Sequence, residues 1–341
     1  MTLIACLHPR QCRTLFADVL ISSKEASNQD FALPTRAYIA PDWFNSLSAK
    51  PCTYRRKVIE VTPQLVILWS GDYPTAHQLA TRARDWFTMS SPSEDDVRGL
   101  LDKHYQEPIP NLHAIIVPAS VEWYYTIGAV QVAGTGSEIF MEMAHQMLPS
   151  AGVIPPELEA LRIANDFMAQ EMITGAPVRA LFGGAYEILY HASNEGFNRV
   201  DDVMHIFRFV RVLSEDKIEI YQGPHVTRQW YDGSQLCVAS LSSPGAVEQQ
   251  LGSIGFPVAS ILDEPKQFTR SVEDLSMPPK YMCVHHIFDF GEKQIPCSMT
   301  LKGPDTIDLH FMLKGDGSAA RLEHTVEYET KVREMAKQLS G

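Results

Sequence analysis

The order of strand-like and helix-like segments limits the folds that this chain can adopt. Strand-like runs open the sequence, and two helices are expected between residues 74 and 104. Two more helices are expected from residue 138 to about residue 173, and strand-like runs lie before and after them. This order differs from the strict strand–helix alternation of a Rossmann fold. It favours an α+β protein in which stacked sheets carry helices on both outer faces.

The C-terminal part differs from what precedes it. A Ser-Ser-Pro-Gly break at residues 242–245 suggests a main domain over residues 1–240 and a small α+β extension over residues 241–341. Within the extension, alternating apolar residues predict a hairpin between residues 295 and 313, with its turn at residues 302–305. A terminal helix is expected over about residues 319–339.

Charge and composition limit the binding partners and the cellular compartment that we expect for this protein. The 341 residues include 29 Lys and Arg against 41 Asp and Glu, a net charge of −12. Nucleic acids and anionic membranes need a positive surface, so neither is expected as a partner. We see no run of roughly 18 apolar residues that could span a membrane and no secretion signal. The six cysteines lack paired spacing, which indicates free thiols and favours the cytoplasm.

The residue after the initiator methionine is a threonine. A small second residue permits removal of Met1, which would make Thr2 the N-terminal residue. Its hydroxyl is a nucleophile, and its α-amine, with a pKa near 8, is a base. One residue would then carry a minimal catalytic pair.

Around Thr2 the sequence resembles the first two strands of proteasome β-subunits and related N-terminal-nucleophile (Ntn) hydrolases. In that family an Asp lies sixteen residues after the catalytic Thr, and Asp18 has this spacing. Residues 66–72 (VILWSGD), followed by an Ala-rich helix, are similar to the family strand that carries the oxyanion-hole amide. The resemblance continues through residues 133–137 (AGTGS) and Gly183-Gly184, and so covers about residues 2–190.

This resemblance implies a fold and a site. The fold is a four-layer αββα sandwich over residues 1–240. Thr2 would be nucleophile and base, Asp18 would orient a lysine, and Ser137 would hydrogen-bond the Thr2 amine. The backbone N–H of Leu68 would stabilise the oxyanion. Lys50, just before the expected third strand, is the first choice for the lysine.

Some positions depart from the family pattern. Lys57 is the second choice for the lysine, because it looks like part of the strand itself. Leu68 stands where the family has Gly, and Arg179 and Phe182 replace an Asp and a Ser that complete the family site. A guanidinium at position 179 could replace the lysine by pairing with Asp18, but Phe182 cannot replace a hydroxyl.

Two functions follow from this resemblance. The first is an N-terminal threonine amidohydrolase or peptidase that acts on a peptide or amide substrate. The second is a catalytically degenerate proteasome-fold protein that serves as an assembly or binding subunit. Family members assemble through their helical layers, so the resemblance also implies a homo-oligomer.

Two other patterns admit simpler explanations. Thr135 and Glu138 form a T-x-x-E capping box, and Ile139 occupies the third glycine position of a nucleotide-binding loop. Cys283, His285 and His286 lie together, but the spacing typical of a zinc site is missing. We therefore expect no metal and no cofactor.

Overall fold

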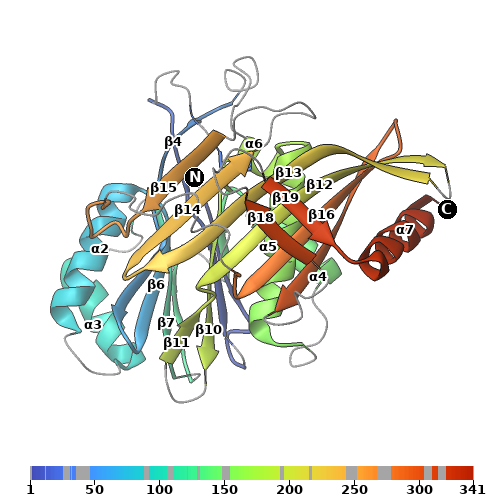
Figure 1. The fold of residues 1–341 in the computed structure, drawn as a ribbon. Coiled ribbons are helices and arrows are strands. Elements are labelled where there is room, and N and C mark those ends of the chain that lie inside the picture. Colours follow the sequence, from blue (N-terminus) through green and yellow to red (C-terminus); the bar gives the residue numbers. More distant parts are fainter. Residues whose placement is uncertain are drawn as a thin grey trace.

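The computed structural model describes most of the chain. The described residues are 2–11, 13–25, 31, 33–35, 47–87, 92–105, 109, 111–120, 122–128, 131–147, 154–192, 196–214, 217–242, 252–266, 278–302, 309–313 and 320–340. They form a mixed α/β structure made mostly of antiparallel strands, with six described helices (Figure 1). No helix in this part of the chain is both long enough and apolar enough to cross a lipid bilayer.

The N-terminal strand lies inside a five-stranded antiparallel sheet. The order of this sheet is β11 (Gly196–Arg199), β10 (Tyr186–Ala192), β2 (Thr14–Asp18), β1 (Leu3–Leu7) and β9 (Val132–Gly134). Successive side chains of a strand point to opposite faces, so β1 divides its apolar residues between two cores. Leu3 and Ala5 face one core, whereas Ile4 and Cys6 face another.

A second sheet covers the face that carries Ile4 and Cys6. Its strands run in the order β5 (Val58–Thr62), β6 (Leu65–Gly71), β7 (Leu112–Pro118) and β8 (Tyr125–Ile127). Val66 and Leu68 of β6 and Ile115 of β7 share one buried cluster with the β1 side chains. Beside these sheets, β3 (Leu20–Ser23) pairs with β4 (Lys50–Tyr54).

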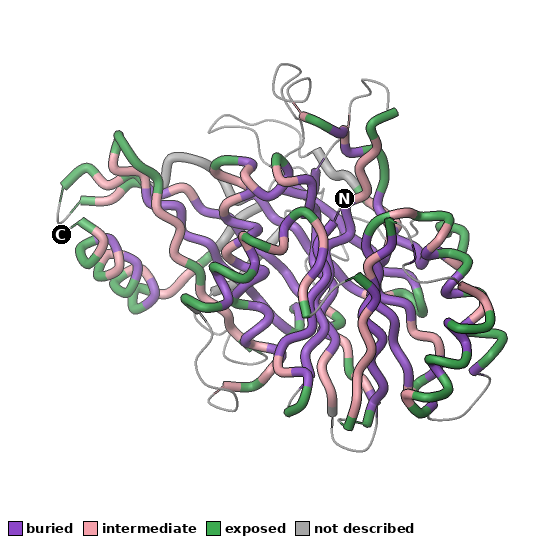
Figure 2. Tube along the Cα trace, turned by 180° about the vertical axis from the view of Figure 1, so that it is seen from behind, coloured by how far each residue is buried: buried purple, intermediate pink, exposed green. Residues whose placement is uncertain are grey.

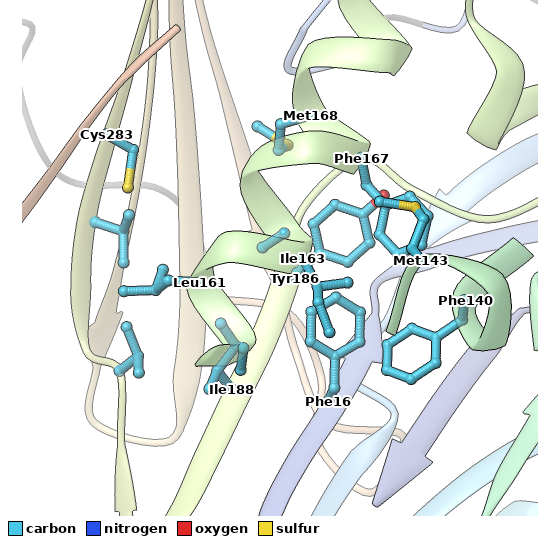
Figure 3. Packing of buried hydrophobic residues seen from close by; sticks show 14 of the residues in the cluster. Phe16, Phe140, Met143, Leu161, Ile163, Phe167, Met168, Tyr186, Ile188 and Cys283 are labelled. Atoms are coloured by element: carbon cyan, nitrogen blue, oxygen red, sulfur yellow. The ribbon is translucent and has the colours of Figure 1, made fainter. Parts of the chain in front are cut away.

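Helices cover the other face of each of these two sheets. α2 (Tyr73–Trp86) and α3 (Glu94–His104) pack on the four-stranded sheet, and Asp72 and Ser93 cap their N-termini. α4 (Ser137–Met147) and α5 (Pro156–Ile173) pack on the five-stranded sheet. There the rings of Phe16, Phe140, Phe167 and Tyr186 stack against one another (Figure 3). A short helix, α6 (Ala176–Arg179), follows α5.

A six-stranded sheet joins the middle of the chain to its C-terminal part. Its order is β15 (Gly252–Val258), β14 (Gln235–Ser242), β13 (Lys217–Asp232), β12 (Asp202–Ser214), β16 (Tyr281–Asp289) and β17 (Gln294–Lys302). β12 and β16 pair in parallel. This sheet therefore contains strands from both sides of residue 240, and α5 packs against β16 and β17. α7 (Val326–Ser340) buries Tyr328, Val332 and Ala336 against its other face.

The expected hairpin between residues 295 and 313 is wrong for the described strands. β17 pairs with β16, while β18 (Leu309–Leu313) pairs with β19 (Ala320–His324). Residues 303–308, which include most of the expected turn, lie outside the described residues, as do residues 243–251 of the expected break. β19 occupies residues that the sequence assigned to the terminal helix, which begins instead at Val326. The partner of β17 is therefore set by its pairing with the buried strand β16 and not by the turn residues that follow it.

Candidate active site

Asp18 is a fully buried carboxylate at the end of β2, and four donors converge on it. Its Oδ1 accepts hydrogen bonds from the Leu3 N–H at 2.7 Å and from Lys57 Nζ at 2.5 Å. Its Oδ2 accepts from the N–H groups of Leu20 at 3.2 Å and Gly183 at 2.9 Å. The carboxylate thus joins the strand that follows Thr2, a lysine and the glycine pair in one buried network.

Lys57, between β4 and β5, is the cation in contact with Asp18. Its side chain is fully buried, and Nζ also donates to the Leu20 carbonyl at 2.6 Å. The Lys57 carbonyl accepts from the Trp69 N–H of β6 at 3.1 Å, which fixes the backbone of this linker. The ammonium therefore has a defined position under the N-terminal strand.

Burial and pairing act in opposite directions on these two groups. Burial lowers the pKa of Lys57 from 10.5 to about 8, although the nearby Asp18 raises it. Burial likewise raises the pKa of Asp18, against the effects of Lys57 and of the Leu3 and Gly183 N–H groups. A lysine whose pKa lies near neutrality, held by a carboxylate, is the type of group found where enzymes transfer protons.

Thr2 immediately precedes Leu3, whose N–H bonds Asp18, and it is 1 % exposed. Its Oγ1 is buried and has no hydrogen-bond partner among the described residues. Gly134 of β9 packs against the Thr2 carbonyl so closely that a Cβ there would lie 1.8 Å from the oxygen. Because buried hydroxyls normally find a partner, an unpartnered Thr hydroxyl one residue before the strand held by Asp18 is a feature that needs an explanation.

A second buried carboxylate fixes the glycine pair from the opposite side. Glu171 of α5 accepts from the Gly184 N–H at 3.0 Å and from the Thr35 hydroxyl. Gly183 has a φ of 126°, and a Cβ there would lie 2.3 Å from Glu171 Oε2. Consecutive N–H groups of Gly183 and Gly184 are therefore held by Asp18 and Glu171. A side chain at Gly183 would meet Glu171, and one at Gly184 would meet the Tyr54 ring at 2.8 Å.

A cavity of about 850 Å³ opens next to this network. Three segments line most of it, namely residues 22–24 at the end of β3, residues 70–72 at the end of β6, and residues 132–135 of β9 and the turn after it, with Ser137 at the start of α4. Its lining is rich in hydroxyls and also includes the imidazole of His113. Thr2, Asp18 and Lys57 do not line it, but Gly134 lines the cavity and contacts Thr2.

The structure brings together only some of the residues that the sequence singled out. Ser137 begins α4 and lines the cavity, on the same segment as Gly134. Lys50 lies opposite Ser23 at the start of β4, whereas the lysine that contacts Asp18 is Lys57. Leu68 lies inside β6, fully buried between Val58 and Ile115, and it does not line the cavity.

The structure also places Arg179 and Phe182, two residues that depart from the family pattern. Arg179 is exposed at the end of α6. Phe182 is fully buried and packs on Gly136, where a Cβ would meet the ring at 2.6 Å. Its ring also stacks edge-on against Phe167, at 5.1 Å between centroids. Phe182 therefore belongs to the apolar core behind the turn before α4.

Sequence reasoning missed Glu171 and ranked Lys57 second. Glu171 lies in a helix whose other residues are mostly apolar, and a glutamate in such a helix is a weak signal of a buried partner. At the cavity, the end of β6 is formed by Ser70 and Gly71, two and three residues beyond Leu68. Ser70 and Gly71 belong to residues 66–72, the segment that resembles the oxyanion-hole strand of the family.

No protein-family model matches the chain, and no curated protein matches it. The evidence for a function is therefore the geometry of the site itself. The described residues contain no group of three or more His, Cys, Asp or Glu side chains arranged to hold a metal ion.

Proposed function

We propose that this protein is an N-terminal threonine hydrolase of the proteasome-like Ntn type that cleaves an amide or peptide bond. Thr2 becomes its nucleophile once Met1 is removed. The observation that carries the proposal is the buried Asp18–Lys57 pair, whose shared oxygen also holds the N–H of the residue after Thr2. A purely structural role gives no reason to bury a lysine at this position, because burying an ion pair rarely increases stability.

The proposed mechanism uses three groups. The free α-amine of Thr2 takes the proton of its own hydroxyl, and Oγ1 attacks the carbonyl carbon of the substrate. The Lys57 ammonium stabilises the negative charge that develops beside it, and Asp18 holds the ammonium in place. The amine then gives its proton to the leaving nitrogen, and water hydrolyses the resulting ester. The cavity beside Gly134 would hold the substrate.

The arrangement of the two N-terminal sheets supports the same proposal. α4 and α5, the five-stranded sheet, the four-stranded sheet, and α2 and α3 pack successively through three buried clusters. We propose that these are the layers of a four-layer αββα sandwich of the Ntn type. The six-stranded sheet and α7 would then be additions packed against α5.

A β-lactone probe tests the proposed nucleophile. We expect the probe to acylate Thr2 in the natively expressed protein, and tandem mass spectrometry will locate the adduct. The Thr2→Ala variant should not react, whereas Thr2→Ser should retain labelling. Thr53→Ala is the control, because Thr53 is exposed on β4, away from Asp18. Labelling that persists in Thr2→Ala would contradict the proposal.

One observation favours a second candidate, a degenerate subunit with a role in assembly or binding. Phe182 places a buried apolar ring where the family has a hydroxyl. This candidate predicts that the protein remains unlabelled even after Met1 is removed. Both candidates imply self-association through the helical layers, which light scattering coupled to size-exclusion chromatography will measure.

A further inference from the structure

A second group of polar side chains lies on the face of the six-stranded sheet that packs against α5. His205 of β12 lies opposite Cys283 of β16, and His285 of β16 lies opposite Ser298 of β17. Cys283 belongs to the apolar cluster that contains the α5 side chains, and His285, two residues on, shares its face. The group therefore lies between the sheet and α5, on three neighbouring strands.

Hydrogen bonds join three of these side chains in a line. The Ser298 hydroxyl lies 2.8 Å from His285 Nδ1, and His285 Nε2 lies 3.1 Å from His205 Nδ1. A neutral imidazole has one donor and one acceptor nitrogen. In the tautomer in which Nδ1 of His285 accepts the serine proton, its Nε2–H donates to His205 Nδ1, so His205 can hold the tautomer that serves the serine.

Both imidazoles are buried, while the serine is accessible. His285 is fully buried, with the Phe207 ring stacked on it at 4.5 Å between centroids. Burial lowers the pKa of His205 to about 3 and that of His285 well below its usual value. Both are therefore neutral at pH 7, the form in which His285 can accept a proton. Ser298 is exposed on the edge strand β17.

Ser298 opens into a cavity of about 480 Å³ between α5 and β17. Asn165 and Thr300 line the cavity beside it, and they are joined by a hydrogen bond of 2.9 Å. The Asn165 Oδ1 is buried and has no partner among the described residues. The remaining walls include the apolar side chains Leu158 and Pro296, and the charged residues Arg162 and Asp166 also line the cavity. A cavity with apolar walls and a few convergent polar groups has the character of a small-molecule site.

We propose that Ser298, His285 and His205 form a second nucleophilic site, which accepts small activated acyl esters. A serine hydrogen-bonded to a base, with the base oriented by a third group, is the geometric signature of an activated nucleophile. This site shares no residue with the Thr2 network, so it does not depend on the function proposed above.

The reaction is a simple acyl transfer to serine. Oγ of Ser298 forms a bond to the acyl carbon as its proton passes to His285 Nδ1. The bond to the leaving alkoxide or thiolate breaks, and this group takes the proton from His285. Water then attacks the acyl-serine in the same way, gives its proton to His285, and releases the carboxylic acid as Oγ recovers that proton.

The imidazoles of His205 and His285 have no carboxylate partner among the described residues, and this limits the substrate class, although Asp166 lines the cavity. Within the described residues, no Asp or Glu hydrogen-bonds to His285 or His205, so an imidazolium formed in this buried site is weakly stabilised. The site should therefore act on esters with good leaving groups, such as aryl esters or thioesters, rather than on amides.

A fluorophosphonate probe tests the proposal, because it reacts with activated serines. We expect it to modify Ser298 in the full-length protein, as located by tandem mass spectrometry, and we expect no modification at this position in Ser298→Ala. His285→Asn should lower the labelling rate by about a hundredfold or more, the scale of a general base. Circular dichroism will establish that this variant is folded, and the wild-type result stands without it.

Two controls separate this site from others. Ser240 also lies near an imidazole, 3.2 Å from His225 Nε2, but it is buried and bonded to the Pro34 carbonyl. Ser240→Ala should leave Ser298 labelling unchanged, and so should Thr2→Ala. If wild-type protein shows no adduct at Ser298, or if His285→Asn labels at the wild-type rate while folded, the proposal is wrong.

Discussion

The hydrogen bonds of Asp18 limit the role that its carboxylate can have. Its two oxygens accept four hydrogen bonds, about the number of lone-pair sites that a carboxylate offers. A carboxylate used so fully cannot also serve as a general base for substrate. In the mechanism that we propose, Asp18 therefore positions Lys57 and the backbone after Thr2, and another group acts as the base.

Two lysines allow a matched test at this scale. Lys57→Met removes the buried cation and leaves Asp18 uncompensated, so we expect a loss of about 3–5 kcal/mol in the free energy of unfolding. We also expect labelling of Thr2 by the lactone to disappear. Lys50→Met at the half-buried start of β4 should cost less than about 1 kcal/mol and retain labelling. Urea unfolding measures the stability of both variants, and mass spectrometry measures their labelling. If Lys50→Met loses labelling and Lys57→Met retains it, the catalytic lysine is Lys50.

Spacing alone could indicate Asp18 but could not choose between Lys50 and Lys57. Asp18 follows Thr2 within one hairpin, where the chain has little freedom to change the separation. Lys57 lies 39 residues after Asp18, so counting residues from a family pattern is unreliable there. Which lysine is buried depends on how the linker before β5 packs on Asp18, and this is a tertiary contact.

At the scale of elements, the closeness of β9 to β1 controls the position of Thr2. Gly134 has a φ of 102° and touches the Thr2 carbonyl, so Gly134→Ala is strained and sterically blocked. We expect it to lower the free energy of unfolding by at least about 2 kcal/mol and to abolish Thr2 labelling.

Gly99 provides the control for this prediction. It lies in α3 with nothing within 4 Å of the Cβ position, so Gly99→Ala should stabilise the protein by about 0.5–1 kcal/mol through helix propensity. Thermal or urea unfolding measures both variants. Equal effects of the two substitutions would contradict the tight contact between β9 and β1.

The strands of the six-stranded sheet carry four buried histidines whose pKa values burial depresses. The values are about 3 for His205 and His286 and about 4 for His225, while that of His285 is well below its usual range. In the unfolded chain they titrate near 6.5, so below this pH the unfolded state binds more protons than the native state. The contribution of these histidines to the free energy of unfolding should therefore be constant above about pH 6.5, and stability should fall as the pH drops below it.

The size of this effect is the slope of the free energy of unfolding against pH. Each histidine contributes about 1.4 kcal/mol per pH unit once the unfolded chain is fully protonated, until its native pKa is reached. Urea unfolding between about pH 7 and pH 4 will measure the sum, and His225→Gln should reduce the slope by about one proton. A free energy of unfolding that stays level down to pH 5 would show that these side chains are not buried as described.

At the scale of the whole molecule, the buried core continues through the six-stranded sheet into the C-terminal part (Figure 2). β12 pairs with β16 over nine residues, and α5 packs on β16 and β17. A chain ending at residue 240 would expose one edge of β12 and one apolar face of α5. We expect this fragment to aggregate or to unfold without a cooperative transition, as size exclusion and circular dichroism will show. A soluble, cooperatively folding fragment would support two separate domains.

The sequence indicated the order of strands and helices but not how distant strands pair. Local patterns placed α2, α3, α4 and α5 because apolar periodicity and caps such as Ser93 act within one element. The parallel pairing of β12 with β16 joins segments more than seventy residues apart in the chain. Nothing local distinguishes that partner from a neighbouring hairpin, which is why β17 was assigned to the wrong partner.

The central claim is that Thr2 begins the mature chain, next to the buried lysine. Intact-mass spectrometry of the natively expressed protein, before and after treatment with the lactone, tests it most directly. The account predicts a mass that lacks Met1 and then increases by a single probe adduct, located on Thr2. A protein that retains Met1, or one that lacks it and takes up the adduct elsewhere, would contradict it.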